Sequence, residues 1–146
     1  MSMFISSVTD RGAMPALVKT MAFSEARLKV IAENVANSST PGYRAKQVDA
    51  KAFQRSLREA LNNRRTNPGK PLVIPASDEL HTDARGFLQV TPHEVPVENV
   101  LFHDGTNMSV EREMADLAET RMTHELSVTL LNGRFMGLRK AIRGSL

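Results

Sequence analysis

Histidine is the residue type in this chain that could most readily bind a metal or move a proton. The four histidines, His81, His93, His103 and His124, stand far apart, and no two of them are three or four residues from each other. A metal site on a helix needs such spacing. The chain has no cysteine, which excludes disulfides, thiolate metal sites and a cysteine nucleophile. We therefore expect no metal site.

Motifs for nucleotide binding or hydrolysis are absent as well. The sequence contains no P-loop, no G-x-G-x-x-G dinucleotide loop and no G-x-S-x-G nucleophile turn. Its acidic residues lie on expected helix surfaces or are scattered through a weakly patterned middle. Catalytic carboxylates must be held rigidly near one another, and no pattern here predicts that arrangement. We expect no catalytic residues, no cofactor and no enzymatic activity.

Positive charge is concentrated in residues 44–70, where eight basic side chains stand against two acidic ones. The basic residues are Arg44, Lys46, Lys51, Arg55, Arg58, Arg64, Arg65 and Lys70. Such a run could neutralise phosphates, so a small basic nucleic-acid-binding protein is one hypothesis. Only Tyr43 and Phe53 could supply stacking aromatics, and no docking motif is recognisable, which counts against that hypothesis. A solvated basic face is the simpler interpretation.

The segment that follows has the opposite charge. Residues 71–108 hold six acidic side chains against Arg85, so the formal net charge of +3 conceals two opposite blocks. A third interpretation of the basic run follows from this. The basic segment of one subunit could face the acidic segment of its neighbour and orient head-to-tail packing.

Length and composition favour helices over a large rigid core. The chain has 146 residues, of which 41% are hydrophobic but only 5% aromatic, with no tryptophan. Its uncharged stretches are shorter than the roughly 18 apolar residues that a membrane-spanning helix needs. Residues 1–16 lack the basic start and the apolar run of a cleavable signal peptide. If the protein leaves the cytoplasm, we expect another route to carry it.

An apolar seam of period 3.5 predicts a helix near the N-terminus. It runs through Leu17, Met21, Ser24, Leu28, Ile31 and Val35. Pro15 suits the first turn of this helix, because its missing N–H would have no helical partner there. The helix should stop within residues 37–42. Pro41 and Gly42 supply the fixed φ and the positive φ of a type II turn.

A second seam predicts a longer helix after residues 104–107. It runs through Val110, Met114, Leu117, Arg121, His124, Val128, Leu131, Phe135, Leu138 and Ile142. Ser109 could cap the first turn. Acidic residues near the start and basic residues near the end match the helix dipole. An unbroken helix from residue 110 to residue 143 would be about 50 Å long at roughly 1.5 Å per residue.

These patterns predict an all-α fold. The long N- and C-terminal helices pair as a coiled-coil-like hairpin, and the middle is irregular and partly mobile. We divide the chain into an N-terminal helix and turn (1–43), a middle region (44–108) and a C-terminal helix (109–146). The middle could carry a helix within residues 45–61, and residues 62–108 are expected to be loop with at most short strands.

The C-terminal helix is too long for the N-terminal helix to cover, so part of each seam should contact other copies. The residues expected to form this assembly interface are Leu28, Ile31, Val35, Leu131, Phe135, Leu138 and Ile142. An amphipathic membrane helix is a competing interpretation. It is disfavoured because the polar faces mix acids with bases.

Residues 34–43, which read N-V-A-N-S-S-T-P-G-Y, resemble the N-terminal signature of bacterial flagellar axial proteins. The C-terminal part of the chain is similar to that of the flagellar basal-body rod protein family, especially its short proximal rod members. The similarity rests on residues 104–107, the pair Glu113-Met114 and the closing run Phe135, Leu138, Ala141, Ile142 and Gly144. The resemblance covers roughly residues 15–50 and 100–144. Its turn motif comprises Asn34, Asn37, Thr40, Pro41, Gly42 and Tyr43, which would fix the angle at which the chain leaves the helix.

The resemblance implies a subunit of the rod, the shaft that transmits motor torque through the periplasm. Rod subunits are exported by the flagellar type III apparatus without a cleaved signal peptide, and their terminal helices pair as an inner helical domain. The implied partners are other flagellar rod proteins, copies of the chain itself, the rod-base adaptor protein and the flagellar export gate. No cofactor, no nucleic acid and no direct membrane span are expected.

Overall fold

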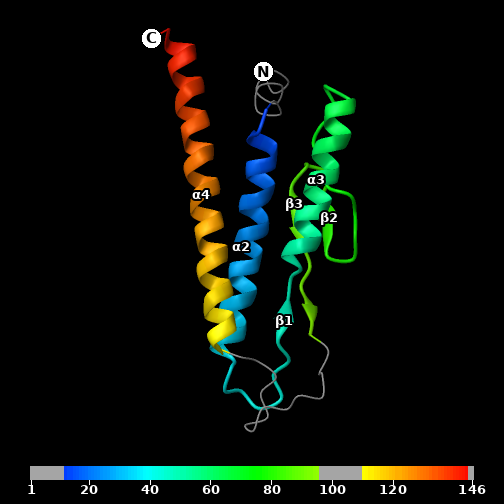
Figure 1. The fold of residues 1–146 in the computed structure, drawn as a ribbon, viewed down its shortest axis with the longest axis vertical. Helices are drawn as coiled ribbons and strands as arrows, with labels where there is room; N and C mark the ends of the chain where they lie inside the picture. Colours follow the sequence, from blue (N-terminus) through cyan, green and yellow to red (C-terminus); the bar gives the residue numbers. More distant parts are fainter. Residues whose placement is uncertain (1–11, 96–109, 145–146) are drawn as a thin grey trace.

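The computed structural model describes residues 12–95 and 110–144. In chain order, the elements are α2 (Met14–Ala36), β1 (Lys46–Gln47), α3 (Ala50–Thr66), β2 (Leu80–Thr82), β3 (Leu88–Val90), β4 (His93–Glu94) and α4 (Val110–Arg143) (Figure 1). The expected cap at Ser109 and the motif residues 104–107 lie outside the described residues. Among the described helices, none combines the length and apolarity that crossing a bilayer requires.

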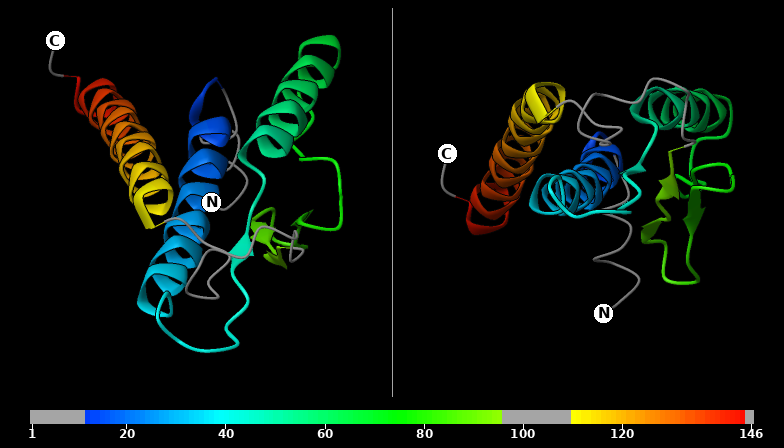
Figure 2. Two further views of the ribbon diagram at one scale, coloured as in Figure 1. Left: turned by 60° about the horizontal axis from the view of Figure 1, so that its bottom comes forward. Right: turned by 90° about the horizontal axis from the view of Figure 1, so that it is seen from below.

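Helix α2 is the central element of the fold. It lies between α4 on one side and α3 with the strands on the other, and it runs antiparallel to α4 (Figures 1 and 2). Pro15 sits in its first turn, as its missing N–H predicts. Every residue of the predicted N-terminal seam is at least half-buried, with Ser24 and Ile31 fully buried. The period-3.5 pattern therefore located this helix and one of its faces correctly.

A second face of α2 builds the hydrophobic core together with the middle of the chain. The buried cluster comprises Phe23, Val30, Val48, Phe53, Ala60, Leu72, Ile74, Leu80 and Leu88. The rings of Phe23 in α2 and Phe53 in α3 stack, with centroids 4.1 Å apart and planes 4° apart. The helix expected within residues 45–61 is present as α3, and residues 67–95 hold only short strands, as expected. What the sequence patterns did not predict is that this region packs into a core. This part of the chain supplies most of the core.

Helix α3 begins where Asp49 can cap it. The Asp49 carboxylate accepts hydrogen bonds from the backbone N–H groups of Lys51 (2.8 Å) and Ala52 (3.0 Å). These bonds favour the ionised form, and the bond from Ala52 is the main reason why the pKa of Asp49 is lowered. The backbone N–H of Asp49 donates in turn to Glu79 Oε2 at 3.1 Å. The start of α3 is thus tied to the approach to β2.

The strands form two small antiparallel sheets, and this corrects the all-α expectation. Strand β1 pairs with β4, with Lys46 opposite Glu94. Strand β2 pairs with β3, with Leu80 opposite Val90 and Thr82 opposite Leu88. The buried Lys19 of α2 donates from Nζ to the carbonyl of Gly86 in the β2–β3 turn at 3.1 Å, which holds this hairpin against α2. The fold is mostly helical with a small β component.

Helix α4 packs against α2, and its buried residues are not the ones expected. Within the described part of α4, only Thr120 and Ser127 are fully buried. Their hydroxyls donate to the carbonyls of Asp116 and Thr123 in the same helix, so burial leaves neither group unsatisfied. Small residues let two helices approach closely. The predicted seam falls beside this line, with Leu117, His124, Val128 and Leu131 half-buried and Arg121 exposed.

Candidate functional site

Asn34 organises the joint between α2 and the rest of the chain. Its side chain is 1% exposed. Its Oδ1 accepts from the backbone N–H of Lys46 (3.0 Å) and from the Tyr43 hydroxyl (3.1 Å). Its Nδ2 donates to the carbonyl of Lys46 (2.8 Å) and to Glu113 Oε2 (3.5 Å). One amide therefore joins the end of α2, the following turn, β1 and the start of α4.

The turn between α2 and β1 closes with the residue types that the motif supplies. The Asn37 side chain donates to the carbonyl of Glu33 at 2.8 Å and satisfies one of the last carbonyls of α2. The backbone N–H of Tyr43 donates to the carbonyl of Thr40 at 3.2 Å, across Pro41 and Gly42. Gly42 has a φ of +75°, as a type II turn requires at this position. The expected turn is present.

Charged side chains reinforce the joint from outside. Lys46 Nζ lies 2.7 Å from Glu33 Oε1, and Arg44 Nη1 lies 3.1 Å from Glu94 Oε2. The hydrogen bond with Glu33 is the main cause that raises the pKa of Lys46. Burial raises the pKa of the Tyr43 hydroxyl, with a further contribution from the negative charge of Glu33. Tyr43 therefore stays a hydrogen-bond donor to Asn34 at neutral pH.

The start of α4 meets α2 through carboxylates. Arg27 Nη2 of α2 lies 3.2 Å from Asp116 Oδ1. Glu113 accepts the longer bond from Asn34, and burial is the main cause that raises its pKa, because the charged form loses hydration. Glu113 and Asp116 lie near the start of α4, where the helix dipole favours negative charge. The sequence pattern alone did not predict that Glu113 contacts the turn motif.

The raised pKa of Glu113 makes a pH-dependent prediction. Below the ordinary carboxyl value of 4.5 the group is protonated in both the folded and the unfolded chain. As the pH rises from there through the raised pKa, the unfolded chain releases the proton first, so the free energy of unfolding falls. We expect Glu113→Gln to unfold at a higher temperature than the parent chain at pH 7. At pH 4 the two should unfold at the same temperature.

Thermal unfolding followed by circular dichroism at both pH values checks this prediction. Asp116→Asn is the matched control, because it removes the ion pair with Arg27 and should lower the unfolding temperature at pH 7. A Glu113→Gln variant that is less stable at pH 7 than at pH 4, relative to the parent chain, would show that the Glu113 charge stabilises the fold.

The predicted assembly residues divide by position. In α2, Ile31 is buried and Leu28 and Val35 are half-buried. In α4, Leu131 and Leu138 are half-buried, while Phe135 is 44% and Ile142 83% exposed. Figure 1 shows α4 continuing past the N-terminal end of α2. The apolar residues at the end of α4 thus extend beyond the helix that covers its first half.

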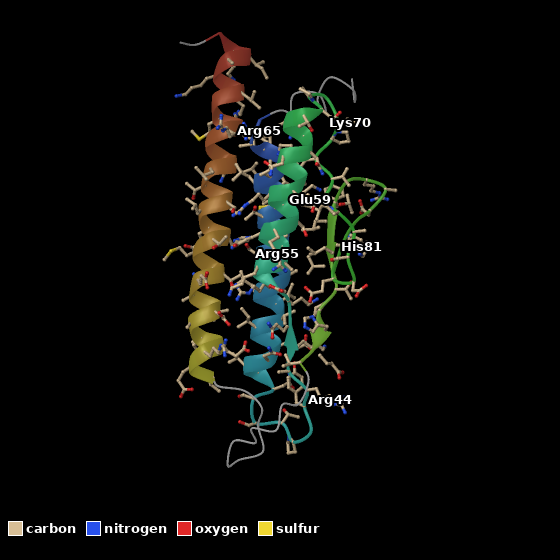
Figure 3. All side chains as sticks on the ribbon, turned by 45° about the vertical axis from the view of Figure 1, so that its right-hand side comes forward. Arg44, Arg55, Glu59, Arg65, Lys70 and His81 are labelled. Carbon is tan, nitrogen blue, oxygen red and sulfur yellow. The ribbon has the colours of Figure 1, made fainter. Side chains whose placement is uncertain are left out.

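The basic residues do not gather into one site. Figure 3 shows Arg44 near one end of the molecule and Arg65 and Lys70 near the other, with Arg55 and Glu59 between them on α3. Arg44 and Lys46 already pair with Glu94 and Glu33. In residues 12–95 and 110–144, no three histidine or acidic side chains come close enough together to hold a metal ion.

Comparison with known proteins gives a family match that covers most of α2 and the turn after it. The family described as flagella basal body rod protein matches residues 16–44. The flagellar basal body rod protein FlgB of Salmonella typhimurium is 26% identical over 120 residues, which cover 81% of this chain and 83% of the relative.

Two further relatives align over more of the chain. FlgB of Bacillus subtilis is 26% identical over 133 residues, covering 91% of this chain and 95% of the relative. FlgB of Cereibacter sphaeroides is 28% identical over 133 residues, covering 86% and 90%. The alignments include α4 as well as α2, so they are not confined to the turn motif. Over more than four-fifths of its length, this chain is similar to FlgB members of the flagellar basal-body rod proteins, and its N-terminal helix and turn match that family.

Proposed function

We propose that this chain is a structural subunit of the flagellar basal-body rod, of the proximal type, and that motility depends on it. The observation that carries the proposal is the similarity to FlgB relatives over more than four-fifths of the chain, together with the family match on residues 16–44. The family is structural, and its members are not enzymes. The polar groups around Asn34 agree with a structural role, because they join α2 to the turn, to β1 and to α4.

The proposed mechanism of assembly is burial of the terminal-helix seams. Helices α2 and α4 would pair as a coiled-coil-like hairpin, and Phe135 and Ile142 would be covered by neighbouring subunits. Full burial of such a side chain contributes about 1.5–3 kcal/mol, so a few of these contacts per subunit hold a shaft together. Leu28, Ile31, Val35, Leu131 and Leu138 would complete the same seam.

The joint at Asn34 would give the subunit its stiffness. A shaft under torque needs a fixed angle between its inner helices and its outer parts. The buried amide of Asn34 holds α2, β1 and α4 in one arrangement, and Phe23 and Phe53 pack the middle region onto α2. A hydrogen-bonded joint backed by a packed core resists bending more than a free linker does.

The partners and the location are proposed on the same family resemblance. Partners would be other rod proteins, copies of this chain, the rod-base adaptor protein and the flagellar export gate. The subunit would act in the periplasmic part of the basal body, after export by the flagellar type III system without a cleaved signal peptide. It would cross in an unfolded or partly folded form and become ordered on incorporation.

Leu138→Asp tests the seam directly. We expect the variant to abolish rod assembly and swimming while its cellular level stays normal, because a charge would have to be buried between subunits. Leu138 lies outside the core cluster formed by α2, α3 and the strands, so unfolding of the isolated chain should change little. Soft-agar motility and purification of basal bodies measure the outcome.

The exposed neighbour Arg139 provides the control for this test. Arg139→Asp introduces the same side chain one position along and should leave swimming intact. Normal swimming of the Leu138→Asp strain would refute the interface assignment.

No structural observation favours the nucleic-acid-binding hypothesis. Two of its eight basic residues are ion-paired within the chain, and the labelled members are spread along the molecule (Figure 3).

A further inference from the structure

Four basic side chains of α3 lie in a line along its exposed face. They share this line with one asparagine, and the spacing alternates between four and three residues. The five exposed residues, which we call the basic stripe of α3, are Lys51, Arg55, Arg58, Asn62 and Arg65. At about 100° per residue and roughly 1.5 Å rise, the stripe lies opposite the buried Phe53 and is about 21 Å long. Figures 1 and 2 show α3 at the edge of the fold, separated from α4 by α2.

The charges of the basic stripe are not balanced by ion pairs. In the part of the chain that the structure describes, none of its four bases forms one. Asp49 attracts Lys51 and Arg55, but its carboxylate is engaged by the two N–H groups that it caps. Glu59, the one acid of α3, flanks the stripe without an ion pair. Because like charges three and four residues apart destabilise a helix, the stripe lowers the stability of α3.

The surroundings of the basic stripe disfavour three kinds of anionic partner. A small anion would need bases that converge, whereas these project from one convex line. A nucleic acid would need aromatic side chains for stacking, but Tyr43 is bound to Asn34 and Phe53 lies in the core. A lipid surface would need an apolar helix face, but that face of α3 is packed in the core. An acidic protein surface remains.

We infer that the basic stripe binds an acidic helix of another rod protein, which packs alongside α3 with its carboxylates facing the bases. A helix fits this stripe because residues on one side of a helix also recur at alternating steps of four and three. Opposite charges along the two helices would fix which partner binds and in which register. The contact would offset the repulsion within the stripe.

A second copy of this chain is a poorer partner. Most acids that it could offer are engaged by other groups of their own chain. The engaged carboxylates in the described residues include those of Glu79, Asp83, Glu94, Asp116 and Glu125. In α4, Arg112 and Arg121 also interrupt the acidic residues. The carboxylates that face the stripe should therefore come from a different protein.

The inference rests on the proposed function, because it takes the partner to be part of the rod. A strain that lacks this chain separates the two. If that strain swims, the proposed function fails. If it does not swim but strains with a reversed stripe do, only the present inference fails.

Asn62 allows the contact to be separated from the stability of α3. Asn62→Glu places a carboxylate between Arg58 and Arg65, which should favour the helix but repel an acidic partner. We expect it to reduce the swim ring in soft agar about twofold, whereas Asn62→Lys should leave the ring unchanged. A purely structural role predicts the opposite ranking. An Asn62→Glu strain that swims as well as the Asn62→Lys strain overturns the inference.

Reversal of two bases identifies the partner. Arg55→Glu combined with Arg58→Glu should abolish swimming at a normal cellular level of the chain. Arg55→Lys combined with Arg58→Lys keeps the charge and should swim. Among revertants of the double Glu strain, we expect suppressors that replace Asp or Glu by Lys or Arg in another rod protein. Suppressors confined to this chain or to proteins outside the rod, or normal swimming of the double Glu strain, overturn the inference.

Discussion

Asn34→Asp is expected to destabilise the chain by about 2–4 kcal/mol at neutral pH, although it changes the side chain by one atom. The carboxylate keeps the acceptor that binds Lys46 N–H and the Tyr43 hydroxyl. It loses the donor that binds the Lys46 carbonyl and faces that carbonyl and Glu113 with a buried negative charge. Urea unfolding at pH 7 and pH 4 measures the effect, and protonation of the introduced carboxylate should recover part of the loss at the lower pH.

Asn37→Asp is the matched control for this experiment. It stands three residues away in the same motif and loses one bond, to the carbonyl of Glu33, at a less buried site. A loss of about 1 kcal/mol or less is expected there. If the Asn34 and Asn37 variants were equally mild, the joint would not depend on the buried amide.

Phe53→Ala should be the most destabilising single truncation, at about 3–5 kcal/mol. The ring is buried in the core cluster and stacks on Phe23, so its removal leaves a cavity between α2 and α3. Because the middle region is held to α2 mainly by this cluster, its loss should also weaken the β2–β3 hairpin. Urea unfolding gives the magnitude, and hydrogen exchange of the hairpin amides shows whether the loss spreads.

Phe87→Ala is the comparison for Phe53. The same side chain is deleted from a position that is 58% exposed in the β2–β3 turn, so a change within about 0.5 kcal/mol is expected. A Phe53 variant no weaker than the Phe87 variant would mean that the core lies elsewhere.

The sequence predicted the two long helices and the turn because these features depend on local residue types. The seam from Leu17 to Val35 repeats every 3.5 residues, and Pro15, Pro41 and Gly42 mark positions that few other residues suit. Such signals need no knowledge of the rest of the chain. For the same reason the motif was recognisable, whereas its partners Lys46 and Glu113, 12 and 79 residues from Asn34, were not.

The helix and the short strands of the middle region were predicted, but its contribution to the core was not, because its core residues come in short, separate pieces. Leu72, Ile74, Leu80 and Leu88 become buried only when the hairpin folds onto α2 and α3. Two- and three-residue strands carry no periodicity that a pattern can detect. The second buried face of α2, with Phe23 and Val30, was not predicted because a single seam of period 3.5 describes only one face of a helix.

In α4 the apolar pattern did not predict the two residues that are fully buried in the described part of the helix. Thr120 and Ser127 occupy the α2 side because small residues allow close approach, and their hydroxyls bond within their own helix. Rules that score apolarity pass over such positions. Several large apolar residues of α4 are left exposed as a result: Phe135 and Ile142 on the predicted seam, and Met122 and Leu126 away from it.

If the end of α4 is covered by other subunits of the rod, a photo-reactive amino acid at position 135 should cross-link to them in motile cells of the source bacterium. We expect adducts between this chain and rod proteins, including further copies of itself, that disappear when rod assembly is blocked. Adducts confined to one chain, or unchanged when no rod is built, would contradict it.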